Sequence, residues 1–179
     1  MSFIQTEIQG VVIFEPTVFK DERGYFFESY NADVFKKAGI DTVFVQDNES
    51  KSSYGVVRGI HFQKEPYAQA KLVRVLYGKV LDVAVDLRKG SKTFGQHIAC
   101  ELSGENKRQF FIPRGFGHGF SVLSETAVFA YKCDNFYCKE AEGGIYYADE
   151  TLGIDWKIPA DKIVLSEKDK NHKRFKECF

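Results

Sequence analysis

Short strand-forming segments, separated at regular intervals by glycine-containing or polar turns, dominate this sequence. The chain shows no long helical periodicity, no internal repeat and no glycine-rich phosphate-binding motif. Its aromatic residues include 17 Phe and 9 Tyr, and aromatic rings pack well on pleated strands. Many short strands with little helix indicate an antiparallel sandwich or barrel. We therefore expect an all-β antiparallel jelly-roll with a few short helices, formed as a single domain over residues 1–179.

The expected elements follow from hydrophobic alternation and turn residues. Strands are expected at residues 11–14, 25–30, 43–48, 57–63, 71–77, 79–87, 98–102, 110–112, 127–133 and 145–147. A short helix is expected at 32–38, where Asn31 can cap the start and Gly39 can supply the stop. Glycines and a proline predict a tight irregular path at 113–120, and composition predicts a polar loop at 49–55 and a solvated segment at 165–170.

Charge and termini limit the classes of function. Twenty-five basic residues balance 25 acidic ones, which gives no support for binding nucleic acid or a membrane surface, so a small molecule is the expected partner. The N-terminus lacks the features of a signal peptide, and no segment is apolar enough to span a bilayer. We expect a cytoplasmic protein. The four cysteines have no CxxC spacing, which suits reduced thiols and argues against a structural zinc site.

The segment from Arg58 to Lys71 carries the residues best suited to acid–base chemistry. The imidazole of His61 can move protons near neutrality, and the cations of Arg58 and Lys71 suit an anion or a developing negative charge. Strict alternation along the strand would put Arg58 and His61 on opposite faces. They share a site only if Gly59 breaks the alternation; otherwise Arg58 is a surface residue and His61 a hydrogen-bonded core histidine.

Other positions fit either a structural or a functional role. Lys71 shares a strand face with valines, which suits protection of a sheet edge or a charge held in a cavity. Tyr131 lies on an apolar face, so its hydroxyl either finds one partner in the core or exchanges a proton in a cavity. Gln46 and Asn48 share one strand face and either read a ligand or close a loop.

Metal-dependent chemistry of the cupin type needs His and carboxylate ligands that converge on one ion. Pro113-x-Gly115-x-x-His118 matches the second half of a cupin pattern, but Gln63 replaces the second His of an HxH pair. His61 and His118 therefore have no obvious third ligand, and we expect a cupin-like geometry without a metal.

Two further classes of function compete with acid–base catalysis. A nucleophilic hydrolase would need a Gly-x-Ser-x-Gly turn, which the sequence does not contain. A non-catalytic sugar- or nucleotide-binding module fits the aromatic residues and arginines, but it leaves His61, Lys71 and Tyr131 without a distinctive role. Metal-free acid–base catalysis on an anionic substrate uses all three.

Several sequence blocks carry a more specific signal than these spacings. They are Phe19–Phe26, Gln46–Asn48, Arg58–Gln63, Lys71–Val75, Pro113–Phe120, Tyr131–Cys133 and Leu165–Asp169. In this order they resemble the motifs of the dTDP-4-dehydrorhamnose 3,5-epimerase family across essentially the whole chain. The resemblance implies a homodimeric, cofactor-free jelly-roll enzyme of dTDP-L-rhamnose biosynthesis. Its reaction would convert dTDP-4-dehydro-6-deoxy-D-glucose into dTDP-4-dehydro-L-rhamnose.

The resemblance also implies a role for each matching residue. His61 would be the base, paired with Asp169, and Tyr131 the acid on the opposite face of the sugar. Lys71 would stabilise the enolate oxygen, and the same pocket would be lined by His118 and Arg58. The positions implied to hold the nucleotide sugar are Arg23, Phe26, Glu28, Gln46, Asn48, Glu142 and Lys168, with Tyr137 stacked on thymine.

The scope of the reaction is the point that the resemblance leaves open. Relatives that epimerise only C3 or only C5, or that act on other nucleotide sugars, share most of this framework. Tyr131 favours inversion at both centres, because a site that lacks the acid would release a product altered at fewer carbons.

Overall fold

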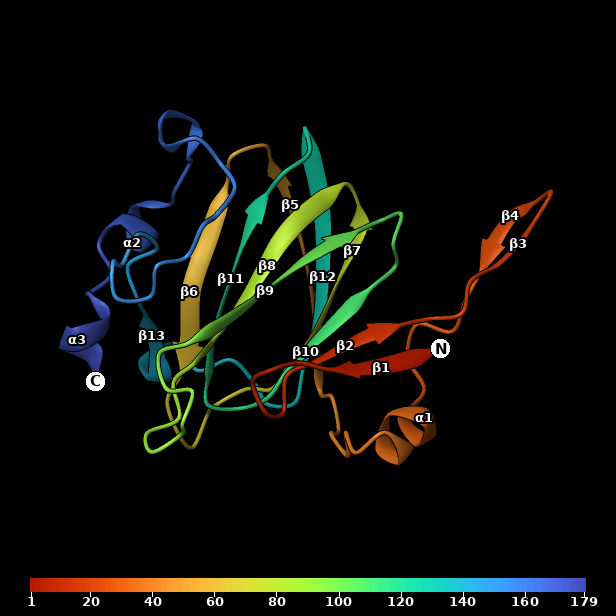
Figure 1. The fold of residues 1–179 in the computed structure, drawn as a ribbon, viewed down its shortest axis with the longest axis horizontal. Coiled ribbons are helices and arrows are strands. Elements are labelled where there is room, and N and C mark those ends of the chain that lie inside the picture. The colour runs from red at the N-terminus through yellow and green to blue at the C-terminus, as the bar shows by residue number, and fades with distance from the viewer.

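Two antiparallel sheets face each other in the computed structural model, which describes residues 1–179 (Figure 1). The larger sheet has the order β1 (Ser2–Gln5), β2 (Val12–Glu15), β10 (Gln109–Ile112), β7 (Lys71–Tyr77), β12 (Thr126–Cys133) and β5 (Gln46–Ser53). The smaller sheet has the order β13 (Glu142–Gly144), β6 (Val57–Gln63), β11 (Phe116–Val122), β8 (Lys79–Asp86) and β9 (His97–Ser103). The expected all-β jelly-roll is confirmed.

The main core lies between the two sheets, because alternate side chains of every strand turn inward. The larger sheet contributes Val73, Val75, Phe110, Ile112, Ala127 and Phe129, and the smaller sheet Val80, Ala84, Cys100, Leu102, Phe116, Phe120 and Val122. The rings of Phe120 and Phe129 stack across the interface with centroids 4.3 Å apart. Burial of each large side chain stabilises the fold by about 1.5–3 kcal/mol, so the sheets form a firm support for residues at their ends.

Shorter segments cover part of each outer face. On the smaller sheet, Trp156 and Phe175 of the C-terminal region pack against strand side chains such as Val83. This region contains the turns Ala160–Lys162 and Lys139–Ala141 and the helices α2 (Glu167–Lys170) and α3 (Phe175–Cys178). On the larger sheet, α1 (Ala32–Lys37) buries Phe35. No helix here has the length and apolar character needed to cross a bilayer.

The helix α1 forms where the sequence predicts it. The side-chain oxygen of Asn31 accepts hydrogen bonds from the N–H groups of Asp33 and Val34, as an N-terminal cap does. Gly39 follows the helix with a φ of +87°. Capping therefore specifies both ends of the helix, and Phe35 fixes which face turns toward the sheet.

The strand β5 differs from its prediction. The sequence predicts a strand at 43–48 followed by a polar loop, but Val43 is 75% exposed and the strand runs from Gln46 to Ser53. β5 is the edge strand beyond β12, so its outward side chains meet solvent and can be polar. A strand with polar residues on both faces has no hydrophobic alternation, so its sequence predicts a loop.

The strand β11 also differs from its prediction, because the irregular path expected at 113–120 is mostly strand. Its glycines permit close approach rather than turning. A Cβ at Gly117 would lie 2.4 Å from Ile60 Cγ2, and one at Gly119 would lie 2.7 Å from the carbonyl oxygen of Arg58. His118 between them is therefore held on a regular strand.

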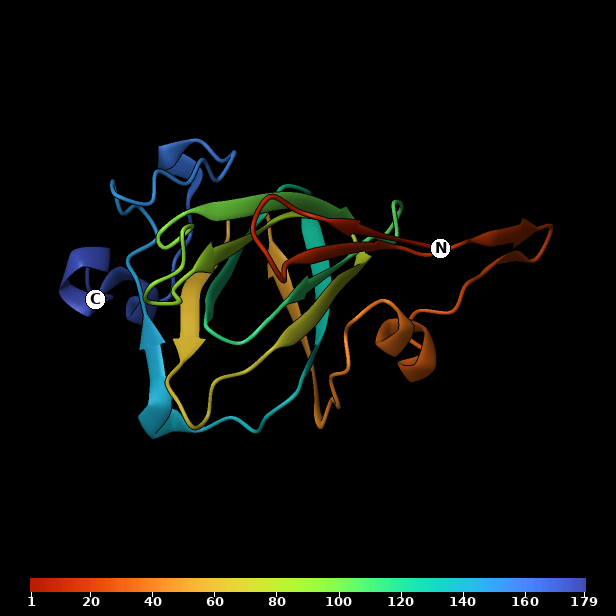
Figure 2. The same cartoon turned by 60° about the horizontal axis from the view of Figure 1, so that its bottom comes forward.

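Two further strands are shorter than predicted. The segment expected at 25–30 is a strand only at β4 (Gly24–Phe26), which pairs with β3 (Phe19–Asp21) in a hairpin. The segment expected at 145–147 forms a single bridge between Ile145 and Lys173, next to β13. The hairpin extends from the body of the molecule, past the N-terminus (Figures 1 and 2).

Candidate active site

A cavity of about 290 Å³ lies at one end of the sandwich. β5 and β7 begin there and β12 ends there, and across from them β6 ends and β11 begins. Figure 2 brings this end toward the viewer and shows β6 and β13 opposite β5, β7 and β12. Most of the predicted site residues line the cavity: Gln46, Asn48, His61, Lys71, His118, Tyr131, Tyr137 and Glu142.

His61 and Asp169 form the predicted pair. His61 Nε2 lies 2.5 Å from Asp169 Oδ1, and Asp169 Oδ2 accepts a hydrogen bond from Ser166 Oγ at 2.7 Å. Burial alone would raise the pKa of Asp169, but the hydrogen bonds from His61 and Ser166 outweigh it and hold the pKa below its usual value. The carboxylate therefore stays charged behind the ring, and His61 Nδ1 is left without a protein partner.

Lys71 and Tyr131 lie on the wall opposite His61, on β7 and β12. Lys71 Nζ is 5.6 Å from the centre of the Tyr131 ring. Burial lowers the pKa of Lys71, and the charges of Cys133, Asp82 and Glu142 counter part of this shift. Burial raises the pKa of Tyr131, so its phenol keeps its proton at neutral pH. The cavity thus has a potential base on one wall and a potential acid on the other.

His118 has a carboxylate partner that the sequence did not reveal. Its Nε2 lies 3.0 Å from both carboxylate oxygens of Asp82, a residue of β8 with no exposed surface. Burial lowers the pKa of His118, although Asp82 counters this effect. His118 is therefore neutral at physiological pH and is fixed in orientation, directly across the strand pair from His61.

Polar residues form the mouth of the cavity. Gln46 Nε2 donates to Asn48 Oδ1 at 3.1 Å, and Gln46 Oε1 accepts from the backbone N–H of Tyr137 at 3.1 Å. The Tyr137 hydroxyl donates to Glu142 Oε2 at 2.9 Å, and Lys168 forms an ion pair with Glu142. The Tyr137 ring is 55% exposed and offers a flat apolar surface beside these groups.

The predicted break at Gly59 is present. Gly59 has a φ of +125°, and the register between β6 and β11 shifts between His118 and Phe120. Arg58 nevertheless does not line the cavity, because its Nε and Nη2 donate to Ser52 Oγ on β5 at 3.2 and 3.1 Å. Its positive charge is still close enough to lower the pKa of Tyr131 slightly against the larger effect of burial.

The remaining predicted residues lie away from the chain's own cavity. Arg23 is at the tip of the β3–β4 hairpin with its side chain 85% exposed, paired only with Asp21. Phe26 on the same hairpin is 70% exposed. Glu28 lies beside α1 and accepts a hydrogen bond from Asn31 Nδ2 at 3.1 Å. None of the three contacts His61 or its neighbours.

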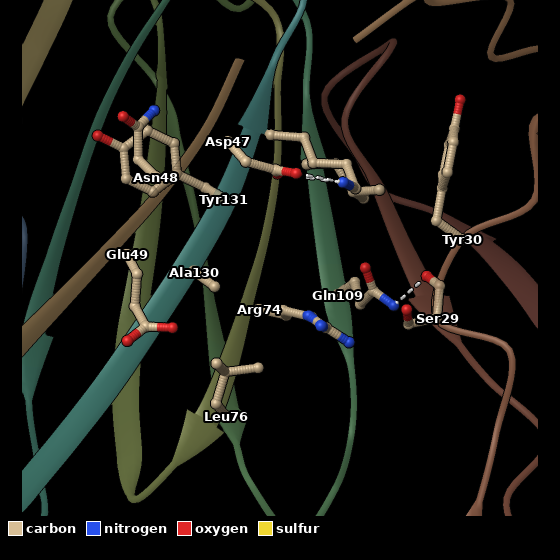
Figure 3. A pocket seen from close by; sticks show the side chains of 12 residues that line it. Ser29, Tyr30, Asp47, Asn48, Glu49, Arg74, Leu76, Gln109, Ala130 and Tyr131 are labelled. Atoms are coloured by element: carbon tan, nitrogen blue, oxygen red, sulfur yellow. Dashed lines mark hydrogen bonds and ion pairs between the residues drawn. The ribbon is translucent and has the colours of Figure 1, made fainter. Parts of the chain in front are cut away.

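A second hollow, of about 280 Å³, lies on the outer face of the larger sheet. Figure 3 shows Asn48 and Tyr131 on one side of this sheet and Arg74 and Gln109 on the other. On the outer side Gln109 Nε2 donates to the backbone carbonyl of Ser29 at 2.6 Å. Lys132 and Asp47 form an ion pair in this hollow, but no histidine lines it, so its residues offer no base suited to proton transfer near neutrality.

Comparison with known proteins gives the family. The family model described as dTDP-4-dehydrorhamnose 3,5-epimerase matches residues 5–177. The chain belongs to this family. The dTDP-4-dehydrorhamnose 3,5-epimerase of Shigella flexneri is 56% identical over 176 residues, which cover 98% of this chain and 96% of that protein.

Solved structures of the epimerase family agree with the fold. The dTDP-4-dehydrorhamnose 3,5-epimerase of Elizabethkingia anophelis has a TM-score of 0.95 at 60% identity, covering 99% of this chain and 97% of that one. The Legionella pneumophila epimerase, in complex with dTDP-4-keto-L-rhamnose, has a TM-score of 0.93 at 51% identity and covers 97% of this chain and 92% of that one.

Sequence reasoning missed other residues at this epimerase-type site. Gln69 and Cys133 line the cavity, and His172 lies 3.4 Å from Asp169 Oδ1 through its Nε2. Cys133 shares a face of β12 with Tyr131, as strand parity predicts, but was not proposed as a site residue. His172 follows α2, just beyond the segment predicted to be solvated at 165–170, and nothing in its local sequence predicts its position.

Proposed function

We propose that this protein epimerises dTDP-4-dehydro-6-deoxy-D-glucose at C3 and C5, giving dTDP-4-dehydro-L-rhamnose, with His61 as base and Tyr131 as acid. The observation that carries the proposal is that these two residues face one cavity from opposite sheets. Inversion of a carbon requires proton removal on one face and proton delivery on the other, and a site with two facing walls suits both steps.

The proposed steps follow from the acidity of carbons next to a ketone. His61 Nδ1 removes the proton from C3 or C5, and the electrons of the C–H bond form an enolate with its charge on the C4 oxygen. The Lys71 ammonium stabilises that charge in a site of low dielectric. Tyr131 then donates its phenolic proton to the same carbon from the other face. The carbon keeps its oxidation state, so proton transfer between side chains is sufficient.

The size of the cavity suits only part of the substrate. Ligand pockets commonly measure roughly 300–1,000 Å³, and a cavity of about 290 Å³ is at the lower end of this range. We assign the sugar to the cavity and the nucleotide to the mouth, where the Tyr137 ring stacks on the thymine. Gln46, Asn48, Glu142 and Lys168 supply hydrogen bonds and charge around it.

We also propose a homodimer in which the β3–β4 hairpin reaches a neighbouring subunit. Phe19, Tyr25 and Phe26 on this hairpin are 63%, 57% and 70% exposed, an apolar surface suited to contact with another chain. The outer face of the larger sheet is covered only at the end where α1 packs. In such a dimer Arg23 pairs with the substrate diphosphate in the partner's cavity, assisted by Phe26 and Glu28, while Arg58 acts within its own subunit.

Proton NMR of the substrate incubated with the protein in deuterium oxide tests the proposed reaction. We expect deuterium at both C3 and C5 together with the L-rhamno product. Exchange at only one carbon would reduce the activity to that of a mono-epimerase. Binding without exchange would identify a non-catalytic nucleotide-sugar-binding protein.

The variant Tyr131→Phe tests the division between base and acid. It should retain deuterium exchange better than it retains inversion, because His61 can still form the enolate while the opposite face lacks a donor. Equal loss of both would contradict the assignment of Tyr131.

Sedimentation of the wild type and of a variant with Phe19 and Phe26 replaced by Ser tests the proposed dimer. The variant should dimerise more weakly than the wild type.

A further inference from the structure

Three side chains that carry metal-ligating atoms meet behind the cavity: His61, Asp169 and His172. Their nearest ligand atoms all lie within 4.8 Å of one another. Asp169 Oδ1 is 2.5 Å from His61 Nε2 and 3.4 Å from His172 Nε2, so a nitrogen of each ring lies close to the same carboxylate oxygen. Their ring planes meet at 75° with centroids 5.4 Å apart.

His172 is held in this position without a hydrogen bond to its ring. Its Nε2 is buried and has no hydrogen-bond partner. The ring lies against the backbone of β13, since a Cβ on Gly144 would come within 2.2 Å of it. The bridge between Lys173 and Ile145 fixes the chain immediately after it. A buried nitrogen with no partner is costly in a protein, so a ligand for this atom would recover lost free energy.

We propose that His61, Asp169 and His172 form a binding site for Zn²⁺, or a chemically similar divalent transition-metal ion, whose occupation blocks catalysis. Two imidazoles and a carboxylate, with water from the cavity as a fourth ligand, are a donor set that zinc accepts. Tetrahedral zinc holds its donors about 3.3 Å apart, and the distance from Asp169 Oδ1 to His172 Nε2 already has this value.

The shorter distance between His61 and Asp169 shows what the ion replaces. In the form that acts as base, His61 carries its ring proton on Nε2, 2.5 Å from Asp169 Oδ1. Zn²⁺ takes the Nε2 lone pair, the ring proton moves to Nδ1, and the Nε2 and Oδ1 atoms separate by roughly an ångström. Each ligating nitrogen must be free of a proton, so acid weakens binding. Ser166 Oγ keeps its hydrogen bond to Asp169 Oδ2 and orients the carboxylate for the metal.

The consequence for turnover follows from the position of the ring proton. An ion on His61 Nε2 leaves that proton on Nδ1, the nitrogen that takes the substrate proton in the proposed mechanism. Nδ1 then has no lone pair for the C3 or C5 proton, so removal of that proton stops. This inhibition depends on the proposed role of His61, whereas binding of the ion does not.

Equilibrium dialysis of the full-length protein against Zn²⁺, paired with the deuterium-exchange assay, tests the proposal. The wild type should bind one ion per chain in this site and lose activity with the same midpoint, and EDTA should restore it. His172→Phe preserves a ring against Gly144 and loses no hydrogen bond. It should weaken both Zn²⁺ binding and inhibition by at least about tenfold, with inhibition measured against the variant's own metal-free rate.

Two further variants exclude other sites and failed folding. His172→Gln repeats the test if the phenyl ring disturbs packing, and His97→Gln on β9 should keep the wild-type midpoint. Co²⁺ should give no thiolate charge-transfer band, since no cysteine takes part. Unchanged Zn²⁺ binding in both His172 variants, or a thiolate band, overturns the site. An inactive metal-free wild type would instead overturn the proposed function. Zn²⁺ binding measured by dialysis would still test the metal site.

Discussion

The two hydrogen-bonded histidine–carboxylate pairs of this molecule have their histidines on neighbouring strands but differ in exposure. The His61 side chain is 30% exposed and its carboxylate has a second hydrogen-bond donor in Ser166. The His118 side chain is 8% exposed, and Asp82 has no side-chain partner other than His118. Its greater exposure to the cavity makes the first pair suitable for moving protons. Near-complete burial makes the second pair a fixed support, although His118 also borders the cavity.

The largest expected effect separates the two pairs by activity. His61→Asn should lower the rate of deuterium exchange by roughly 10³-fold, because the general base is lost. His118→Asn should lower it much less, since His118 moves no proton in the proposed mechanism. Exchange rates for both variants, with His97→Asn as the control, check this. Equal losses of exchange rate in the His61 and His118 variants would contradict the distinction between the two pairs.

The second effect separates the pairs by stability. His118→Leu leaves the Asp82 carboxylate buried without its hydrogen bond, so the free energy of unfolding should fall by about 3 kcal/mol. His61→Leu leaves Asp169 bonded to Ser166 and should cost only about 1 kcal/mol. Urea unfolding of the two variants measures the difference. A larger loss in His61→Leu would contradict the comparison.

A third, smaller effect appears in the pH dependence of stability. Burial lowers the pKa of His118 in the folded protein below its ordinary value of about 6.5, so the unfolded chain binds the proton more tightly. The contribution of His118 to the free energy of unfolding is therefore complete above pH 6.5. It is lost as pH falls below that value, by up to about 1.4 kcal/mol per pH unit. His118→Gln should unfold with a shallower acid slope than the wild type. Parallel slopes would show that His118 protonates freely in the fold.

The smallest effect concerns the hydrogen bond that only the first pair has. Ser166→Ala removes the cap of α2 and the donor to Asp169 Oδ2, which should lower stability by about 1 kcal/mol and slow exchange a few-fold. Ser166→Thr keeps a hydroxyl and should restore both. Failure of Thr to restore activity would show that the hydroxyl does not act through Asp169.

Hydrophobic residues predicted most strands, including β7, β8, β9, β10 and β12, because at least one face of each is buried, and both faces of β8 and β10 are. They failed to predict β5, whose faces meet solvent and a polar cavity, and β11, where Gly117 and Gly119 serve packing rather than turning. Local pattern carries no information about which distant backbone approaches a glycine. Both strands contribute residues to the cavity.

The sequence predicted His61, Lys71 and Tyr131 as candidates from their chemistry, and strand parity predicted that Lys71 shares a face with core valines. Asp169 came only through the family resemblance, since its neighbours are polar and its burial depends on α2 packing behind β6. Asp82 was missed because its partner His118 lies on another strand, and pairing across a sheet cannot be predicted from spacing along the chain. His172 was missed because its position depends on packing against Gly144 of β13.

The exposed hairpin β3–β4 has a genetic consequence. If Arg23 serves the partner's cavity as proposed, a chain with Arg23→Ala and a chain with His61→Asn are each inactive alone but complement one another when mixed. The mixed dimer has one cavity that contains an intact His61 and receives an intact Arg23. The functional unit under selection is then the pair of chains, and two defective alleles in one cell can together supply the activity that neither supplies by itself.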